Sequence, residues 1–311
     1  ESPLYDPTHY NMGAVWPFVT GFVALGHYQY ARPWAGYPLV DALSRMAFDW
    51  ARGRHPELLS GAYYRPLDTA VPHQFFATSM LVSPVASGLL GFEPDAPGRR
   101  ARLSPQLPPQ WGKVRVAGLP VGDVRLGLAI EQEPGRLSLR LEPSGGPLVL
   151  SLRPRPSPGA RGLTAAVDGV PVPVTPSGVV EVVLEGRPRA VEVRWTGGLD
   201  VEPPTVPLEP GQADRGVRVL AFASVADGWR LALEGPSGRS ATVRLHGQAG
   251  LSAEGATLRS RGLVTEATVA FPVSDRPFAR AEVALTAPRP RASFPRILRP
   301  SKDLKAATST R

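Results

Sequence analysis

The spacing of apolar residues changes near residue 92, and this change separates two kinds of predicted element. Before residue 92, apolar positions recur every three or four residues, as they do on the buried side of an α-helix. They predict helices over about 15–30, 39–50 and 75–90, with a kink at Pro84 inside the third. These helices are apolar on most sides, which is typical of helices inside a larger helical body.

From about residue 113, apolar and polar residues alternate, as in a β-strand with one buried face. Turn residues such as Pro134 and Gly135 separate the alternating stretches. The predicted strands cover residues 114–116, 123–132, 136–142, 147–153, 164–167, 179–184, 189–195, 217–224, 229–234, 241–246, 267–271 and 280–285. Short strands with regular turns predict antiparallel β-sandwiches, with Trp195 and Trp229 in their cores.

Together the two patterns predict an α+β protein of several domains. The expected parts are helices at 1–92, a β-sandwich at 93–200, a proline-rich linker at 201–216, a second, small β-sandwich at 217–287, and a basic, disordered tail at 288–311. Three helices this apolar do not bury all their sides on one another, and the chain starts at Glu1 in a polar stretch. We therefore expect it to be the C-terminal part of a longer protein.

Charge and composition exclude several kinds of partner. The net charge is +8, but residues 288–311 hold seven basic residues and one acidic residue, so the rest is nearly neutral. This distribution predicts no nucleic-acid partner. No run of about 18 apolar residues is present, so no membrane partner is predicted. The chain has no cysteine, and its five histidines show no ligand spacing, so neither a metal nor another cofactor is expected. The oligomeric state is left open.

Candidate chemistry gathers in the stretch 55–74, between the second and third predicted helices. Glu57 follows Pro56 just after a helical pattern ends, and Tyr63 and Tyr64 follow it. A fixed carboxylate that accepts a proton, with aromatic faces beside it, suits the handling of a sugar. The alternatives are a plain connection between helices, an exposed loop acid at Glu57, and Asp68 as the active carboxylate.

Further candidates lie before the first helix and at the start of the third. Trp16 has an indole face on which a sugar ring packs well, and the alternative is a core anchor. Asn11 is able to bond sugar hydroxyls or to cap the helix. His73 and Gln74 both donate and accept hydrogen bonds, although His73 also fits a buried structural histidine.

Several segments resemble a known family. They are YNMGAVWPFVTGF, PELLSG, YRPL, PHQFFATSMLVSP, LLGFEPDA and RLSPQLPPQW. They resemble the C-terminal part of bacterial glycogen-debranching-like, amylo-α-1,6-glucosidase-type glycoside hydrolases, which belong with glucoamylases and α-rhamnosidases to the (α/α)6-barrel glycosidases. The likeness covers residues 1 to about 112. It implies that residues 1–92 are the last helices of a truncated (α/α)6 toroid.

The resemblance also implies roles for particular residues. Glu57 takes the place of the family's general base, and residues Tyr10 to Pro17 reach the sugar. His73 and Gln74 open the last inner helix, and Asn11 stands where many relatives have histidine. The general acid would lie upstream, so this chain would be inactive alone.

The implied reaction is the inverting hydrolysis of α-linked glucans or oligosaccharides, with an oligosaccharide or polysaccharide as the partner. Two alternatives stay open. One is a phosphorolytic enzyme, in which inorganic phosphate is the nucleophile and no base is needed. The other is a non-catalytic carbohydrate-binding or scaffold protein.

Overall fold

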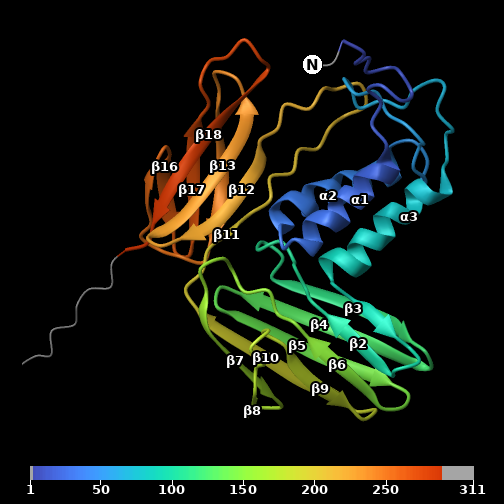
Figure 1. Cartoon of the computed structure of the whole chain (residues 1–311), viewed down its shortest axis with the longest axis vertical. Helices are drawn as coiled ribbons and strands as arrows, with labels where there is room; N and C mark the ends of the chain where they lie inside the picture. Colours follow the sequence, from blue (N-terminus) through green and yellow to red (C-terminus); the bar gives the residue numbers. More distant parts are fainter. Residues whose placement is uncertain (1–2, 289–311) are drawn as a thin grey trace, which may run out of the picture.

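The helices come first in the chain, as the apolar spacing predicts. The computed structural model describes residues 3–288, and Figure 1 shows its helices beside four β-sheets. The helices are α1 (Pro17–Gln29), α2 (Pro33–Asp49) and α3 (Phe75–Ser83). Pro17 and Pro33 stand in the first turns of α1 and α2, where the N–H that proline lacks would have no helical partner.

The third helix changes its winding at Pro84, where the sequence predicts a kink. From Pro84 to Leu89 the chain forms the π-helix η1. Because proline has no N–H for the regular helical bond, the wider winding lets later donors reach further back. Gly88 lies against Tyr28 of α1, and a Cβ at Gly88 would lie 2.5 Å from the Tyr28 ring. Glycine therefore permits the close approach of η1 to α1.

Two sheets follow the helices and occupy the lower part of Figure 1. One has the strand order β1-β2-β6-β9, and the other has the order β3-β4-β5-β10-β7-β8. Their strands are β1 (Glu93–Asp95), β2 (Arg100–Leu103), β3 (Lys113–Val121), β4 (Val124–Glu133), β5 (Arg136–Ser144), β6 (Leu148–Leu152), β7 (Arg161–Val167), β8 (Val170–Val172), β9 (Val180–Leu184) and β10 (Arg189–Thr196). Strands β2 and β6 are parallel, with Ala101 opposite Leu150.

Two more sheets, each of four strands, lie at the upper left of Figure 1. Their strand orders are β11-β14-β17-β16 and β12-β13-β18-β15. The strands are β11 (Asp200–Val201), β12 (Arg218–Val225), β13 (Gly228–Pro236), β14 (Ser240–His246), β15 (Ser252–Glu254), β16 (Thr257–Arg261), β17 (Val264–Ala270) and β18 (Phe278–Thr286). Every strand that the alternation predicts coincides with one of the observed strands to within a few residues.

Each pair of sheets has its own hydrophobic core. The first core joins the helices to the first pair and includes Tyr28, Leu128 and Leu150. The second core lies between the other two sheets and includes Trp229 and Leu245. The alternation of apolar residues along the strands supplies both cores, because it turns one face of every sheet inward.

The expectation that residues 1–92 are the last helices of an (α/α)6 toroid is wrong. The described residues contain three α-helices of 13, 17 and 9 residues and four β-sheets, so the chain is rich in β-structure. Apolar spacing is a local signal that predicts a helix, whereas closing a ring depends on contacts between many helices. The expectation of purely antiparallel sheets is also wrong, at β2 and β6.

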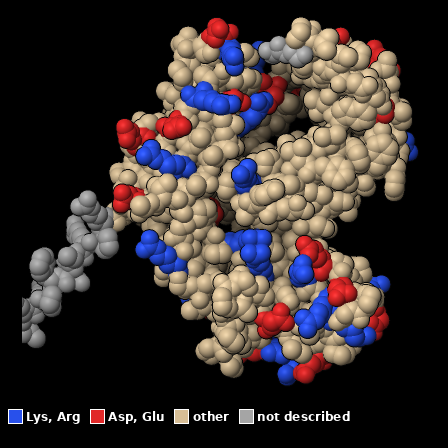
Figure 2. All heavy atoms as spheres, viewed as in Figure 1, with Lys and Arg blue, Asp and Glu red and all other residues tan. Residues whose placement is uncertain are grey.

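The helices leave a broad apolar surface exposed. It includes Val19 and Phe22 on α1, Phe48 on α2, and Phe75 and Val82 on α3. Figure 2 shows few charged side chains over the helices, in contrast to the mixed charges over the sheets. None of the helices in residues 3–288 has the length and apolar character needed to cross a membrane.

The proline-rich segment between β11 and β12 runs back to the helical part. Gly211 N–H donates to Tyr64 O, and Tyr64 N–H donates to Gln212 O, both at 2.8 Å. Figure 1 shows this segment rising past α2 before it returns to β12. The tail predicted at 288–311 lies, apart from Pro288, outside the described residues. The division into domains at 92, 200, 216 and 287 stays a prediction.

Candidate functional site around Glu57

Glu57 lies on an extended segment that two other segments hold in place. Two positions further along this segment, Leu59 forms β-bridges with Val15 on one side and with Pro66 on the other. Glu57 N–H donates to Val71 O at 2.9 Å. The connection between α2 and α3 is therefore fixed against the residues that lead into α1.

The Glu57 carboxylate is buried, with 7% of the residue exposed, and accepts three hydrogen bonds. Oε1 accepts from the Tyr10 hydroxyl and from Gln74 Nε2, the latter at 3.0 Å. Oε2 accepts from Val71 N–H at 3.2 Å. All three donors are neutral, and within residues 3–288 no basic side chain forms an ion pair with this carboxylate.

Tyr10 and Trp16 form an aromatic pair beside the carboxylate. Their ring centroids are 5.0 Å apart, with an interplanar angle of 89°. The hydrogen bond to Glu57, followed by burial, raises the pKa of the Tyr10 phenol above its usual value. Trp16 stands at the N-cap position of α1 and makes no capping hydrogen bond with its side chain. Asn11 therefore does not cap this helix, and its side chain is exposed.

His55 holds the segment against two helices. It is fully buried, with Nε2 2.8 Å from Leu43 O on α2 and Nδ1 3.3 Å from Thr78 Oγ1 on α3. Burial lowers the pKa of His55, against an opposing effect of the bond to Leu43. A neutral ring satisfies both contacts when Nε2–H donates to the carbonyl and Nδ1 accepts from Thr78. His55 O also accepts from Gln74 N–H at 3.0 Å, which positions Gln74.

The structure does not bring every predicted residue to Glu57. The Tyr64 hydroxyl donates to Asp49 Oδ2 at 2.6 Å, and its ring packs against Trp50 with centroids 4.9 Å apart. Burial raises the pKa of Tyr64. Tyr63 and His73 are exposed. Tyr10, Trp16 and Gln74 thus form the cluster around Glu57, and the sugar-binding roles of the other residues stay predictions.

Two features of the cluster were missed from the sequence. The Val71 N–H is a backbone donor, and any residue type there except proline would supply it, so the sequence carries no signal for it. Gln74 Oε1 is buried and has no hydrogen-bond partner within residues 3–288. A buried acceptor without a partner is costly, and a bound hydroxyl would satisfy it.

The arrangement is suited to accepting a proton and to holding hydroxyl groups. Residues 3–288 contain no group of three or more His, Asp or Glu side chains placed to hold a metal ion. Glu57 has one oxygen held by two side-chain donors and the other by one backbone donor. Its orientation is therefore fixed from three directions.

Comparison with known proteins gives only distant structural likenesses. No protein family matches the sequence, and no curated protein matches it. One solved structure named glycoside hydrolase is similar at 13% identity and a TM-score of 0.34, over 87% of this chain and 51% of its own. The present chain therefore spans about half the length of that protein.

Two further solved structures are similar over less of the chain. A GH127 β-L-arabinofuranosidase from Geobacillus stearothermophilus T6 has 12% identity and a TM-score of 0.28, over 68% of this chain and 36% of its own. A cycloalternan-forming enzyme from Listeria monocytogenes, in complex with a pentasaccharide substrate, has 11% identity and a TM-score of 0.25, over 60% and 22%. Likenesses this distant define neither the reaction of this chain nor a glycogen-debranching type.

Proposed function

We propose that Glu57 is the general base of an inverting glycoside hydrolase that acts on α-linked glucans or oligosaccharides. The proton donor would come from another part of the whole protein, because no second carboxylate of residues 3–288 joins the Glu57 cluster. The observation that carries the proposal is the buried carboxylate itself, which three neutral donors hold without an ion pair in the described residues.

The energetic argument concerns the charge on Glu57. A buried carboxylate costs several kcal/mol unless it is paired or well hydrogen-bonded. The bonds from Tyr10, Gln74 and Val71 recover part of that cost, but none of these donors carries a positive charge. Buried ionisable groups of this kind gather at functional sites. The cost is easier to explain if the carboxylate acts in a reaction than if the segment only connects two helices.

The hydrogen bonds leave room for the base to act. Each carboxylate oxygen has two lone pairs, and Oε2 uses one of them for Val71 N–H. The other lone pair is available for a water molecule. In the proposed reaction this water attacks the anomeric carbon while Oε2 takes its proton, and the acid protonates the leaving oxygen. Tyr10 and Gln74 fix the carboxylate while this happens.

The same cluster offers contacts for a sugar. Tyr10 and Trp16 present an aromatic surface beside the carboxylate, and aromatic side chains pack well on the apolar face of a ring. The unpartnered Oε1 of Gln74 would accept a hydrogen bond from a sugar hydroxyl. We propose the same kind of contact, at longer range, for Asn11, Tyr63, Tyr64 and His73.

The test is the Glu57→Gln variant of the whole protein, assayed on maltooligosaccharides and isomaltose. Loss of a general base removes about 10²–10⁴ in rate, so we expect kcat to fall by that factor in a folded protein. The matched control is Asp68→Asn, since the Asp68 side chain is 90% exposed and pairs with Arg65. A folded Glu57→Gln protein with nearly unchanged kcat would overturn the assignment.

Product analysis separates the alternatives. NMR of the first product should show inversion at the anomeric carbon. Release of a sugar 1-phosphate in the presence of inorganic phosphate would instead indicate a phosphorolytic enzyme. Sugar binding without turnover by the whole protein would indicate a carbohydrate-binding or scaffold protein. Either of these outcomes contradicts the proposed hydrolysis.

A further inference from the structure

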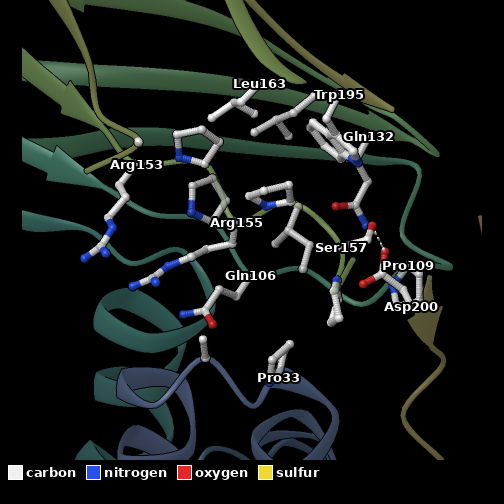
Figure 3. A pocket seen from close by; sticks show the side chains of 18 of the residues that line it. Pro33, Gln106, Pro109, Gln132, Arg153, Arg155, Ser157, Leu163, Trp195 and Asp200 are labelled. Carbon is white, nitrogen blue, oxygen red and sulfur yellow. Dashed lines mark hydrogen bonds between the residues drawn. The ribbon is translucent and has the colours of Figure 1, made fainter. Parts of the chain in front are cut away.

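A cavity lies away from Glu57, where the helices and the two pairs of sheets meet (Figure 3). Its volume is about 480 Å³, within the range of about 300–1,000 Å³ that is common for small-molecule sites. The walls come from the start of α2, the segments 105–109 and 153–158, and the first pair of sheets. Asp200 and His246, from the second pair of sheets, close one end.

The walls are rigid and mostly apolar. Eight of the lining residues are prolines, whose rings fix the backbone. Trp34, Leu137, Leu163 and Trp195 add apolar surface. A cavity with such walls loses little conformational freedom when it is filled, which favours binding.

One end of the cavity is cationic. Figure 3 shows the side chains of Arg153 and Arg155 extending to the same side. Burial lowers the pKa of Arg155, and the neighbouring charge of Arg153 lowers it further. Arg155 Nε donates to Ser104 Oγ at 3.0 Å, but within residues 3–288 neither guanidinium forms an ion pair with a carboxylate. Two like charges left beside each other in this way favour an anion between them.

The opposite end offers acceptors and a hydroxyl. Ser157 Oγ donates to Asp200 Oδ2, as the dashed line in Figure 3 shows. His246 Nε2 lies 2.9 Å from Glu202 Oε2, next to this pair. The cavity thus has guanidinium donors at one end and the Asp200 carboxylate as an acceptor at the other.

Three of the lining residues carry a buried polar atom that has no hydrogen-bond partner in the described part of the chain. These atoms are Trp34 Nε1, Gln106 Oε1 and Trp195 Nε1. Gln106 is only 7% exposed, and its other amide atom donates to Tyr28 O at 3.0 Å. Buried polar groups normally have partners, so a polar molecule in the cavity would lie next to three side chains that have an unused donor or acceptor.

We propose that this cavity binds a polyhydroxylated organic carboxylate, such as a sugar acid, with its carboxylate between Arg153 and Arg155 and its hydroxyls toward Gln106 and Asp200. A guanidinium matches the planar carboxylate with two parallel hydrogen bonds. The hydroxyls satisfy acceptors and donors at the other end, and the ring packs on the proline and tryptophan walls. The site is separate from Glu57 and does not depend on the function proposed there.

The test is calorimetry on the whole protein with D-glucuronate, D-glucose and inorganic phosphate as probes. We expect glucuronate to bind at least about tenfold more tightly than either of the others, since only it has both the carboxylate and the hydroxyls. Arg153→Ala should weaken glucuronate binding by about tenfold or more, because charge-assisted hydrogen bonds are lost. Arg153 is exposed, so this variant is expected to fold.

Two controls assign any binding to the cavity. Arg115→Ala removes one exposed positive charge from β3, outside the cavity, and should leave the affinity unchanged. Glu57→Gln should also leave it unchanged, so failure of this proposal is distinguishable from failure of the catalytic one. Arg155→Lys keeps the charge but loses the paired geometry, and should weaken binding. No glucuronate binding, equal binding by Arg153→Ala, or equally tight phosphate binding would overturn the proposal.

Discussion

The Tyr10 hydroxyl donates a hydrogen bond to Glu57 Oε1 across 47 positions of sequence. This bond joins the loop before α1 to the connection between α2 and α3. Two further contacts, from Gln74 Nε2 and Val71 N–H, complete the set of donors. The carboxylate is thus held by two parts of the chain, the loop before α1 and the segment 71–74 that leads into α3.

The first prediction concerns the ionisation of Tyr10. Its pKa is raised because the phenol must keep its proton to donate to Glu57, and a phenolate would lie beside a carboxylate. In a ¹³C-tyrosine NMR titration, the signal that Tyr10→Phe removes should titrate above the ordinary value. Glu57→Gln should move it back toward that value. Titration of Tyr10 at or below its ordinary pKa would contradict the hydrogen bond.

The second prediction concerns His55, which joins α2 to α3 through Leu43 O and Thr78. His55→Ala removes two hydrogen bonds and leaves a buried cavity, so we expect a loss of about 2–4 kcal/mol in the free energy of unfolding. Urea unfolding at pH 7, followed by tryptophan fluorescence, measures this. A loss below about 0.5 kcal/mol would show that the histidine does not hold the helices together.

The same histidine predicts a pH dependence. Burial lowers the pKa of His55 in the folded state. As the pH falls below the pKa that His55 has in the unfolded state, the unfolded state therefore binds more protons than the folded state. Its contribution to stability is therefore present above that value and is lost as the pH falls through the folded pKa. His55→Ala should lose less stability than the wild type between pH 7 and pH 5. A steeper loss in the variant would contradict this sign.

The third prediction concerns the close packing of two loops at Gly61. A Cβ at Gly61 would lie 2.2 Å from Gly13 O, in the loop that carries Tyr10. Gly61→Ala must therefore push this loop away, and we expect a loss of about 1–3 kcal/mol in the free energy of unfolding. We also expect the Tyr10 pKa to fall toward its ordinary value. Gly112→Ala is the matched control, because nothing lies within 4 Å of a Cβ there. Equal effects of the two substitutions would refute the packing argument.

The fourth prediction concerns Asp200, at the junction of the two pairs of sheets. Burial raises the pKa of Asp200 from 3.8 to about 6, although Ser157 and His246 act in the other direction. The folded state thus holds the proton more tightly, and stability from this group is present below pH 3.8 and lost as the pH rises through about 6. Two pKa units correspond to about 3 kcal/mol at most.

Asp200→Asn should remove this dependence while Ser157 keeps an acceptor. We expect the free energy of unfolding to fall less steeply between pH 4 and pH 6.5 in Asp200→Asn than in the wild type, as measured by urea unfolding. Asp227→Asn is a control, since Asp227 is exposed in the same pair of sheets. An unchanged slope in Asp200→Asn would show that this carboxyl does not titrate in that range.

The sequence analysis named Glu57, Tyr10 and Gln74 as site residues, but not the contacts between them or the Val71 donor. Pro56 and the end of the helical pattern before it mark Glu57 as a residue fixed in a connection. The donors to its carboxylate come from Tyr10, Gln74 and a backbone N–H at Val71, and only folding brings these together. Tyr63 and Tyr64 are nearer in sequence than Tyr10, yet Tyr64 bonds to Asp49 instead.

The sequence by itself predicted the three helices, an irregularity at Pro84 and twelve of the eighteen strands, whereas β1, β2, β8, β11, β15 and β16 were not predicted. These depend on spacing within a few residues, which a linear pattern records. Only the tertiary structure decided that the helices form no toroid, that β2 and β6 run parallel, and that Arg153 and Arg155 share a cavity with Asp200. Such contacts join residues far apart in the chain, and they follow from how whole surfaces pack rather than from local spacing.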